Sequence, residues 1–204
     1  MNIRGVAALG TVGVLAGLLG GCGIRATQVP TDFGPAPSMV PCELSSTDIT
    51  VQATPSGVPV EVFLLCSGRL ARVNRSVLVP DIGDEAKRRL LVAQGLLDAL
   101  AGKPSGAEDE AGYSTAVPAG VRVSGARSGE PEDALRLSTA PDALPKYALA
   151  QIVCTFADSA AAEGDGSVVL GGPGDGSLRR YECTAEVQSS PGDEKPPSSE
   201  VGGS

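Results

Sequence analysis

The stretch VPVEVFLLCSGRLARVNRSV, residues 58–77, decides how the fold begins. Its first half alternates with period two and is apolar on both faces, with Val62 on one face and Phe63 on the other. Apolar residues on both faces are typical of an interior strand. Ser67 and Gly68 are a turn signal, and the residues after them continue the alternation. The sequence therefore predicts an antiparallel hairpin.

A helix is predicted over residues 85–101, soon after this hairpin. Asp84 is placed to cap its first turn, and Gly102 is placed to end it. Gly95 lies inside the helix, which indicates close packing of its backbone against the sheet. The apolar residues step by four and three along one face: Ala86, Leu90, Ala93, Leu97 and Leu100.

The rest of the domain continues this mixture of strands and helix. Short strands are predicted at residues 117–126, 134–138, 168–170 and 181–187. A second helix is predicted with Asp142 as N-cap and an end near Ser159. We therefore expect one α+β domain over 58–187, with two helices packed on a mainly antiparallel sheet.

Polar segments flank this domain on both sides. Residues 22–57 are rich in Pro, Ser and Thr and are predicted to be a spacer. Cys42 and the run 48–51 are placed to tie the end of the spacer to the domain. Residues 188–204 consist mainly of Ser, Pro, Gly and acidic residues, and are predicted to be a disordered tail.

Charge and composition exclude several classes of function. The net charge of −8 argues against nucleic-acid binding, which needs clustered Lys and Arg. The chain has no histidine, which excludes Ser-His-Asp and Cys-His catalysis and His-ligated zinc. No S-x-x-K pattern supplies a Ser-Lys dyad. We expect no catalytic residues, no metal site and no cofactor.

Other polar clusters are assigned to the solvated surface. The glycine-rich segments 164–166 and 171–176 lack the lysine of a phosphate loop and the aspartate spacing of a calcium repeat, so they are predicted to be surface turns. The acidic residues of 108–110 and 130–133 are expected to be solvated. Three arginines are expected to form a charged strand face that discourages edge pairing: Arg69, Arg72 and Arg75.

The N-terminus predicts export and a lipid anchor. Arg4 precedes an apolar run over 6–19, too short for an ordinary membrane span, and small residues follow it. The ending LGGC, residues 19–22, resembles a bacterial lipobox, in which the Cys22 thiol is lipidated. Residues 1–21 are then a lipoprotein signal peptide, and the chain is held on the extracytoplasmic face of the cell membrane. A plain signal peptide with a chance cysteine is the alternative.

Four cysteines remain after Cys22, and an even number in an exported chain predicts two disulfides. We expect Cys42 to pair with Cys66 and Cys154 with Cys183, because each bond closes a local loop. Spacing alone does not choose among the connectivities. The main alternative joins Cys66 to Cys154 and Cys42 to Cys183, and four unpaired buried thiols are a further alternative.

Several segments resemble the GerMN (sporulation and spore germination) domain family. The hairpin 58–73 is similar to the family's opening strands, with Arg75 best placed to match their arginine. The most specific match is GYSTAVPAG, residues 112–120, to a G-x-x-T/S-x-x-P-x-G stretch. The resemblance also includes these segments: 96–104, 135–138 and 149–156. It departs at Arg136, where the family often has an acidic residue, and in the last strand.

The resemblance implies a lipoprotein or membrane-attached envelope protein and no catalytic residues. The function we expect is a non-enzymatic, lipid-anchored module that binds another protein of the cell envelope. Two alternatives stay open at this point. One is a cell-wall enzyme with an unrecognised active site, and the other is a lipoprotein that binds a small ligand.

Overall fold

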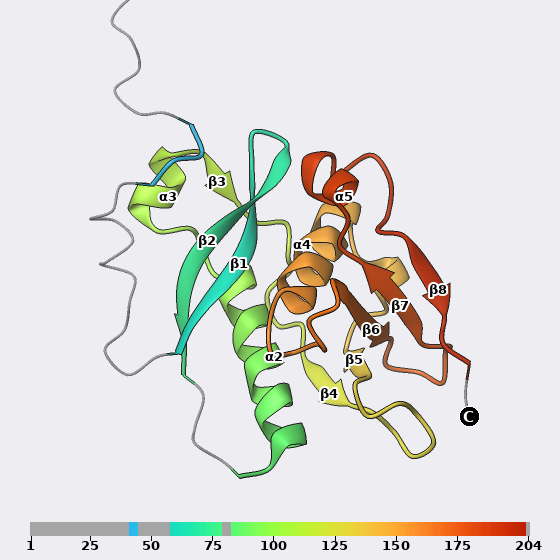
Figure 1. The fold of residues 1–204 in the computed structure, drawn as a ribbon. Coiled ribbons are helices and arrows are strands. Elements are labelled where there is room, and N and C mark those ends of the chain that lie inside the picture. Colours follow the sequence, from blue (N-terminus) through green and yellow to red (C-terminus); the bar gives the residue numbers. More distant parts are fainter. Residues whose placement is uncertain (1–40, 45–57, 79–82, 203–204) are drawn as a thin grey trace, which may run out of the picture. The chain divides into compact units, whose positions relative to one another are not determined.

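The computed structural model describes residues 41–44, 58–78 and 83–202. The elements in chain order (Figure 1) are β1 (Val58–Cys66), β2 (Arg69–Val77), α2 (Glu85–Ala101), α3 (Gly106–Glu110), β3 (Tyr113–Ser114), β4 (Val123–Gly125), β5 (Leu135–Leu137), a 3₁₀ turn (Pro141–Ala143), α4 (Lys146–Ala157), β6 (Ser167–Gly171), β7 (Arg179–Glu182), α5 (Ala185–Ser189) and β8 (Ser198–Glu200). The domain is α+β, as predicted.

Its strands form two sheets where one was predicted. The first has the order β2-β1-β3, and the second has the order β4-β5-β6-β7-β8. All pairings are antiparallel except β5 with β6. Helix α4 contacts strands of both sheets and lies between the β1–β2 hairpin and the five-stranded sheet (Figure 1).

The predicted hairpin is present, with Val58 opposite Val77 and Cys66 opposite Arg69. Its turn residues have φ values of 50° at Ser67 and 79° at Gly68, as a two-residue type I′ turn requires. One face of the hairpin carries Val62, Leu64 and Val73 in the main core. The other face carries Phe63 and Leu70 in a second cluster with residues of α4 and α5.

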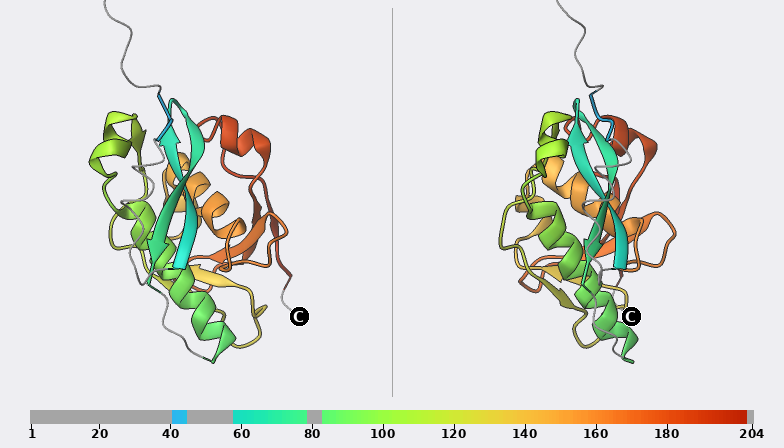
Figure 2. Two further views of the ribbon diagram at one scale, coloured as in Figure 1. Left: turned by 60° about the vertical axis from the view of Figure 1, so that its left-hand side comes forward. Right: turned by 90° about the vertical axis from the view of Figure 1, so that its left-hand side faces the viewer.

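The predicted helix over 85–101 is α2, and Asp84 caps it by accepting from the backbone N–H of Lys87. Both views of Figure 2 show α2 beside the β1–β2 hairpin, which it contacts. A Cβ on Gly95 would clash with a methyl of Val77, so the predicted close packing against the sheet is confirmed. Gly102 caps the other end with φ of −63°, so it does not use the left-handed conformation.

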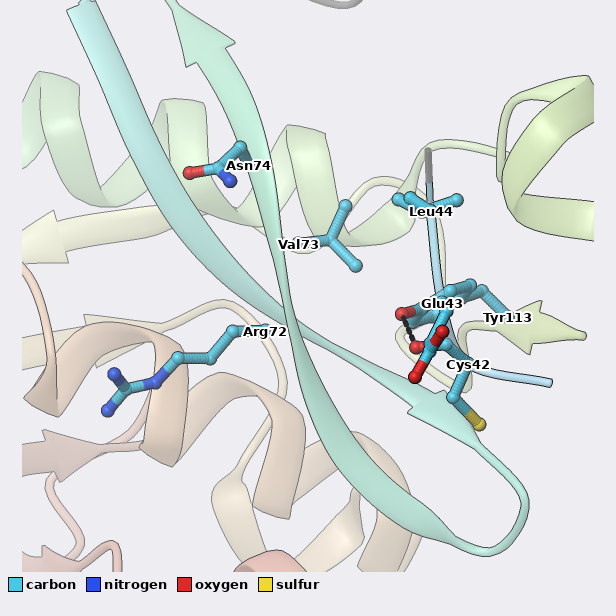
Figure 3. A pocket seen from close by; sticks show the side chains of 7 residues that line it. All are labelled: Cys42, Glu43, Leu44, Arg72, Val73, Asn74 and Tyr113. Atoms are coloured by element: carbon cyan, nitrogen blue, oxygen red, sulfur yellow. Dashed lines mark hydrogen bonds between the residues drawn. The ribbon is translucent and has the colours of Figure 1, made fainter. Parts of the chain in front are cut away.

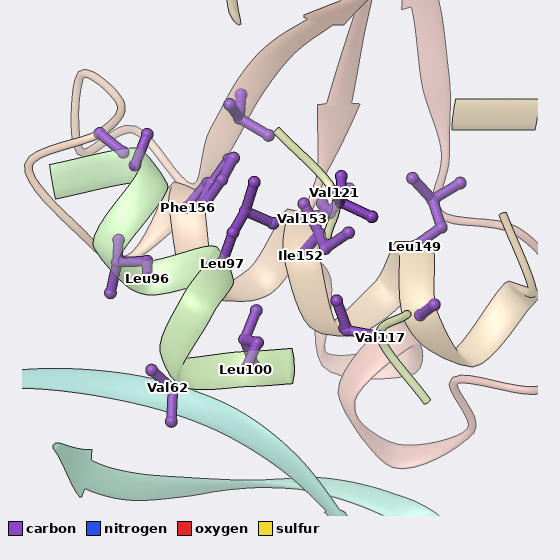
Figure 4. Close-up of a cluster of buried hydrophobic side chains, with 14 of the residues drawn as sticks. Val62, Leu96, Leu97, Leu100, Val117, Val121, Leu149, Ile152, Val153 and Phe156 are labelled. Atoms are coloured by element: carbon purple, nitrogen blue, oxygen red, sulfur yellow. The ribbon is translucent and has the colours of Figure 1, made fainter. Parts of the chain in front are cut away.

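Helix α4 is the centre of the core. Ten of its residues, Ala148–Ala157, are buried, so it packs on every side. Leu149, Ile152 and Phe156 of α4 belong to the same buried cluster as Leu96 and Leu97 of α2 (Figure 4). Because the helix is apolar almost all round, its few polar side chains must find partners inside the protein.

Several predicted boundaries are wrong. Asp142 does not cap α4; it lies in the 3₁₀ turn, and Pro145 occupies the N-cap position without a side-chain bond. The predicted strand 181–187 ends at Glu182, because Thr184 caps α5 instead. Residues 103–115, for which no helix or strand was predicted, contain α3 and β3.

The C-terminal segment predicted to be disordered is largely part of the domain. Residues 190–202 continue from α5, and β8 within them pairs with β7, Arg179 opposite Glu200. Lys195 also bonds the carbonyl of Asp142 at 3.0 Å. Polar strands of this kind are hard to predict because they pair through their backbone and bury few side chains.

Both predicted disulfides are present, Cys42–Cys66 and Cys154–Cys183, with Cα–Cα distances of 5.7 and 4.9 Å. Cys183 follows β7 and precedes α5, so the pairing is correct although the strand that was expected to carry it ends earlier. None of the helices within the described residues is long and apolar enough to span a membrane. The predicted signal peptide 1–21, Cys22 and most of the spacer 22–57 lie outside the described residues.

Candidate functional site

The edge of β1 that faces away from β2 is closed by side chains of α4. β3 pairs only with the end of β1, at Leu65 and Cys66. Before that point, the backbone N–H of Phe63 donates to Thr155 Oγ1 at 3.0 Å, and the Phe63 carbonyl accepts from Gln151 Nε2 at 2.9 Å. Both polar side chains are fully buried. They therefore take the place of a neighbouring strand.

These two hydrogen bonds determine which residues of β2 direct their N–H and carbonyl groups away from β1. In an antiparallel pair, opposite residues alternate between those that exchange both hydrogen bonds and those that exchange none. Phe63 directs its N–H and carbonyl to α4, so its pair with Arg72 is of the second kind. Arg72 and, two residues on, Asn74 therefore direct their N–H and carbonyl groups away from β1.

Among the residues that the structure describes, the outer edge of β2 is open at Arg72 and Asn74. β2 is the terminal strand of its sheet and is nine residues long. Across the described ranges, no hydrogen bond is made by the backbone of Arg72 or Asn74. An unpaired strand edge is a template for pairing with another chain. We take this edge, centred on Arg72, Val73 and Asn74, as the candidate site and call it the β2 edge.

A hollow of about 300 Å³ lies beside the β2 edge. Its lining residues are Cys42, Glu43, Leu44, Arg72, Val73, Asn74 and Tyr113. Figure 3 shows the side chains of Arg72 and Asn74 directed to one side of β2, and those of Val73, Leu44 and Tyr113 to the other. Arg72 and Asn74 thus border the hollow with their backbone, while Val73 lies on its apolar wall.

The far wall of the hollow is formed by residues 42–44 of the predicted spacer. Cys42 is joined to Cys66 by the disulfide and donates its N–H to the Ala111 carbonyl at 3.0 Å. The Tyr113 hydroxyl donates to the Cys42 carbonyl at 2.7 Å. Burial raises the pKa of Tyr113, and the negative charges of Glu108 and Glu43 act in the same direction. The hydroxyl therefore stays protonated and keeps this bond.

Arg75, next along β2, is held by a buried ion pair with Glu108 of α3. Arg75 Nη2 lies 2.7 Å from Glu108 Oε2, and Glu108 is fully buried. Glu108 and Ser105 also form a reciprocal capping box at the start of α3. The prediction that Glu108 is solvated is therefore wrong, although Asp109 and Glu110 are exposed.

Arg72 is exposed on the opposite face of β2. Its guanidinium lies 5.3 Å from the centre of the Phe63 ring, and it pairs with Asp158 at 3.4 Å and Glu61 at 3.8 Å. Strand alternation puts Arg69 and Arg75 on one face and Arg72 on the other, so the three arginines do not form one charged face. β2 is therefore an edge strand without the predicted common face of three arginines.

The glycine-rich segment 171–176 includes the loop that follows β6, and the carbonyl groups of this loop accept hydrogen bonds from arginine. Arg136 donates to the carbonyls of Gly172 and Gly174 at 2.8 and 2.9 Å and pairs with Glu130. Hydrogen bonds from Arg136 and Arg127 lower the pKa of Glu130 to about 2. The loop carbonyls are thus occupied by arginine. Within the described ranges, no group of three or more His, Cys, Asp or Glu side chains is placed to hold a metal ion.

Three parts of this site were not predicted, and two of them have a signal in the sequence. Ser105 and Glu108 fit the S-x-x-E capping-box pattern, which predicts α3 and places Glu108 against its first turn. Gln151 and Thr155 are polar residues at i and i+4 in an otherwise apolar helix, which indicates a polar partner on one side. The open edge itself has no signal, because it depends on where β3 and α4 lie.

Comparisons of the chain with protein-family models, with curated proteins and with solved structures gave no match. The GerMN resemblance therefore stays a prediction from the motifs quoted above.

Proposed function

We propose that this chain is a non-enzymatic, lipid-anchored module on the extracytoplasmic face of the cell membrane, and that it binds another protein through the β2 edge. The observation that carries the proposal is the set of outward backbone groups at Arg72 and Asn74 beside the hollow. A binding domain that adds a partner strand needs such an edge and a neighbouring pocket for side chains.

The attachment of the domain to its predicted anchor supports this proposal. The chain between Cys22 and Cys42 leads from the lipobox to the disulfide that borders the hollow. A partner bound at the β2 edge would then be held close to the point where the tether leaves the domain. The GerMN resemblance supports the same placement, because members of that family are largely membrane-attached envelope proteins.

Site-specific photo-crosslinking tests the binding surface. A photoreactive amino acid at Asn74, which is exposed, should give a discrete protein adduct when cells carrying the full chain are irradiated. The matched control places the same group at Glu132, also exposed, between β4 and β5. Equal adducts at both positions, or none at Asn74, would contradict binding through this edge.

Replacing the lipobox cysteine tests the anchor. The variant Cys22→Ala should lose membrane association, with the domain released or left as an unprocessed precursor. A Cys42→Ala, Cys66→Ala variant serves as the control, because it removes two cysteines and keeps the lipobox. Normal processing and membrane retention of Cys22→Ala would show that the anchor is something else.

A further inference from the structure

We propose that the β2 edge binds an extended peptide segment of another protein, with an acidic residue beside Arg72 and an apolar residue opposite Val73. This inference rests on the proposed function and names the chemistry of the bound segment. It has three parts: backbone pairing at the edge, a side chain in the hollow and a carboxylate at the arginine.

The backbone part follows from the outward groups. Arg72 and Asn74 each offer one N–H and one carbonyl on the same edge, spaced as in a regular strand. An extended segment laid beside β2 would exchange four hydrogen bonds with these two residues. In an antiparallel segment, the residue opposite Val73 would make no hydrogen bond to β2, and cross-strand side chains approach most closely at such pairs.

The hollow determines the residue opposite Val73. Side chains directly opposite one another in a sheet lie on the same face. That residue would therefore direct its side chain to the face of Val73, where the hollow of about 300 Å³ is bordered by Leu44 and Tyr113. A leucine or valine there would remove apolar surface from water, which is favourable.

Arg72 determines the neighbouring residue. Its side chain is 53% exposed, and its two ion pairs, at 3.4 and 3.8 Å, are longer than ordinary hydrogen bonds. The guanidinium has five N–H donors, so it can bind a further carboxylate at closer range. The partner residue opposite Arg72 would lie on the same face, which places an Asp or Glu within reach.

The charge of β2 favours a different chain over a second copy. β2 contains three arginines and no acidic residue. Arg75 is already paired with Glu108, so Arg72 is the guanidinium available on the proposed face. A second β2 would bring another arginine and no carboxylate to it, whereas an acidic segment would supply a carboxylate. The occupant is therefore an acidic, alternating segment of another protein.

Defined peptides test this chemistry with the full chain purified from membranes. The probe TVELEVT has leucine at its centre and glutamates on both sides, so it fits either strand direction. In a fluorescence titration it should bind, whereas TVKLKVT, with the charge reversed, should bind at least about tenfold more weakly. TVESEVT, which lacks the central apolar side chain, should also bind about tenfold more weakly.

Two variants connect the binding to the edge. Asn74→Pro removes an outward N–H without removing a bond to β1, so the protein should fold and lose peptide binding. Asn74→Thr keeps the N–H and should keep the binding. Arg72→Glu should reverse the preference between the glutamate and lysine peptides, which a merely structural role would not do. Should Arg72→Glu fail to fold, Arg72→Gln should make the two peptides bind equally.

The outcomes separate this inference from the proposed function. Equal binding of the three peptides, or binding that survives Asn74→Pro, would overturn the acidic-segment inference. A crosslinked adduct at Asn74 that contains a second copy of this chain would overturn it too, while leaving protein binding through the edge intact. Absence of both peptide binding and any adduct at Asn74 would overturn both proposals.

Discussion

The two outer edges of the β1–β2 hairpin differ in whether their backbone groups are hydrogen-bonded. On the β1 side, Gln151 and Thr155 of α4 bind the backbone of Phe63 where β3 ends. On the β2 side, directly across the strand pair, the backbone of Arg72 has no partner within the described part of the chain. The same cross-strand pair is thus closed at one end and open at the other.

The second sheet closes an edge in the same way. Gln94 of α2 accepts from the N–H of Val123 at 3.0 Å and donates to the Val121 carbonyl at 3.4 Å. A glutamine amide has both a donor and an acceptor, so one side chain serves both groups of an extended backbone. Two helices therefore use a glutamine to close a strand edge. Within the described residues, no side chain of this kind binds the backbone of Arg72 or Asn74.

Amide hydrogen exchange should give the largest contrast between the two edges. We expect the N–H of Phe63 to exchange at least about a thousandfold more slowly than that of Arg72, after correction for intrinsic rates, because only the first is hydrogen-bonded and buried. The N–H of Val73, directed toward β1, is the internal control and should be slow. Equal protection at Phe63 and Arg72 in the isolated protein would mean that the β2 edge is covered.

Removing the closing glutamine of β1 should be strongly destabilising. In Gln151→Leu the buried Phe63 carbonyl and the Ala116 N–H, which lies 2.8 Å from Gln151 Oε1, both lose their partner. Each unsatisfied buried group costs about 1–3 kcal/mol, so the free energy of unfolding should fall by about 2–5 kcal/mol. Urea denaturation measures the change. A loss below about 1 kcal/mol would show that the β1 edge does not need closing.

The corresponding change at the second sheet should have a smaller effect. Gln94 is only partly buried, so water can replace its bonds in Gln94→Leu. We expect the free energy of unfolding to fall by about 1 kcal/mol, measured by the same urea titration. Gln188→Leu, on α5 and not bonded to a strand edge, is the control and should change it less. A larger loss for Gln94→Leu than for Gln151→Leu would reverse the ranking that burial predicts.

Acid should loosen the second sheet through Glu130. The pKa of Glu130 is lowered from 4.5 to about 2 by Arg136 and Arg127, so the folded protein holds this carboxylate more strongly deprotonated than the unfolded chain does. Its contribution to stability is then full above about pH 4.5 and is lost as the pH falls toward 2. In Glu130→Gln the slope of unfolding free energy against pH should become shallower over this range. An unchanged slope would contradict the Arg136–Glu130 contact.

The elements that the sequence predicts well are those with a strong local pattern. The hairpin and α2 follow from period-two and period-3.6 alternation together with the turn at Gly68 and the cap at Asp84. Cys183 and Val187 show the limit of this reasoning. They fit a strand by alternation, but their spacing of four also fits a helix, and Thr184 supplies its cap.

The candidate site was less accessible to prediction because it depends on contacts between distant residues. Gln151 and Phe63 are 88 positions apart, and Glu108 and Arg75 are 33 apart. The buried state of Glu108 follows only once α3 is packed against β2. The β2 edge is open at Arg72 and Asn74 because no described segment pairs with it there. The positions of those other segments are not encoded in any local sequence pattern.

The Cys42–Cys66 disulfide also has a mechanical consequence. A pulling force applied to the chain before Cys42 crosses the disulfide to Cys66 and does not travel through residues 43–65. β1 is thus bypassed by the load, and the force enters the domain at the turn between β1 and β2. The second disulfide, Cys154–Cys183, bypasses β6 and β7 in the same way. If the proposed anchor at Cys22 is pulled against the C-terminus, this covalent path leaves β1, β6 and β7 outside the loaded chain.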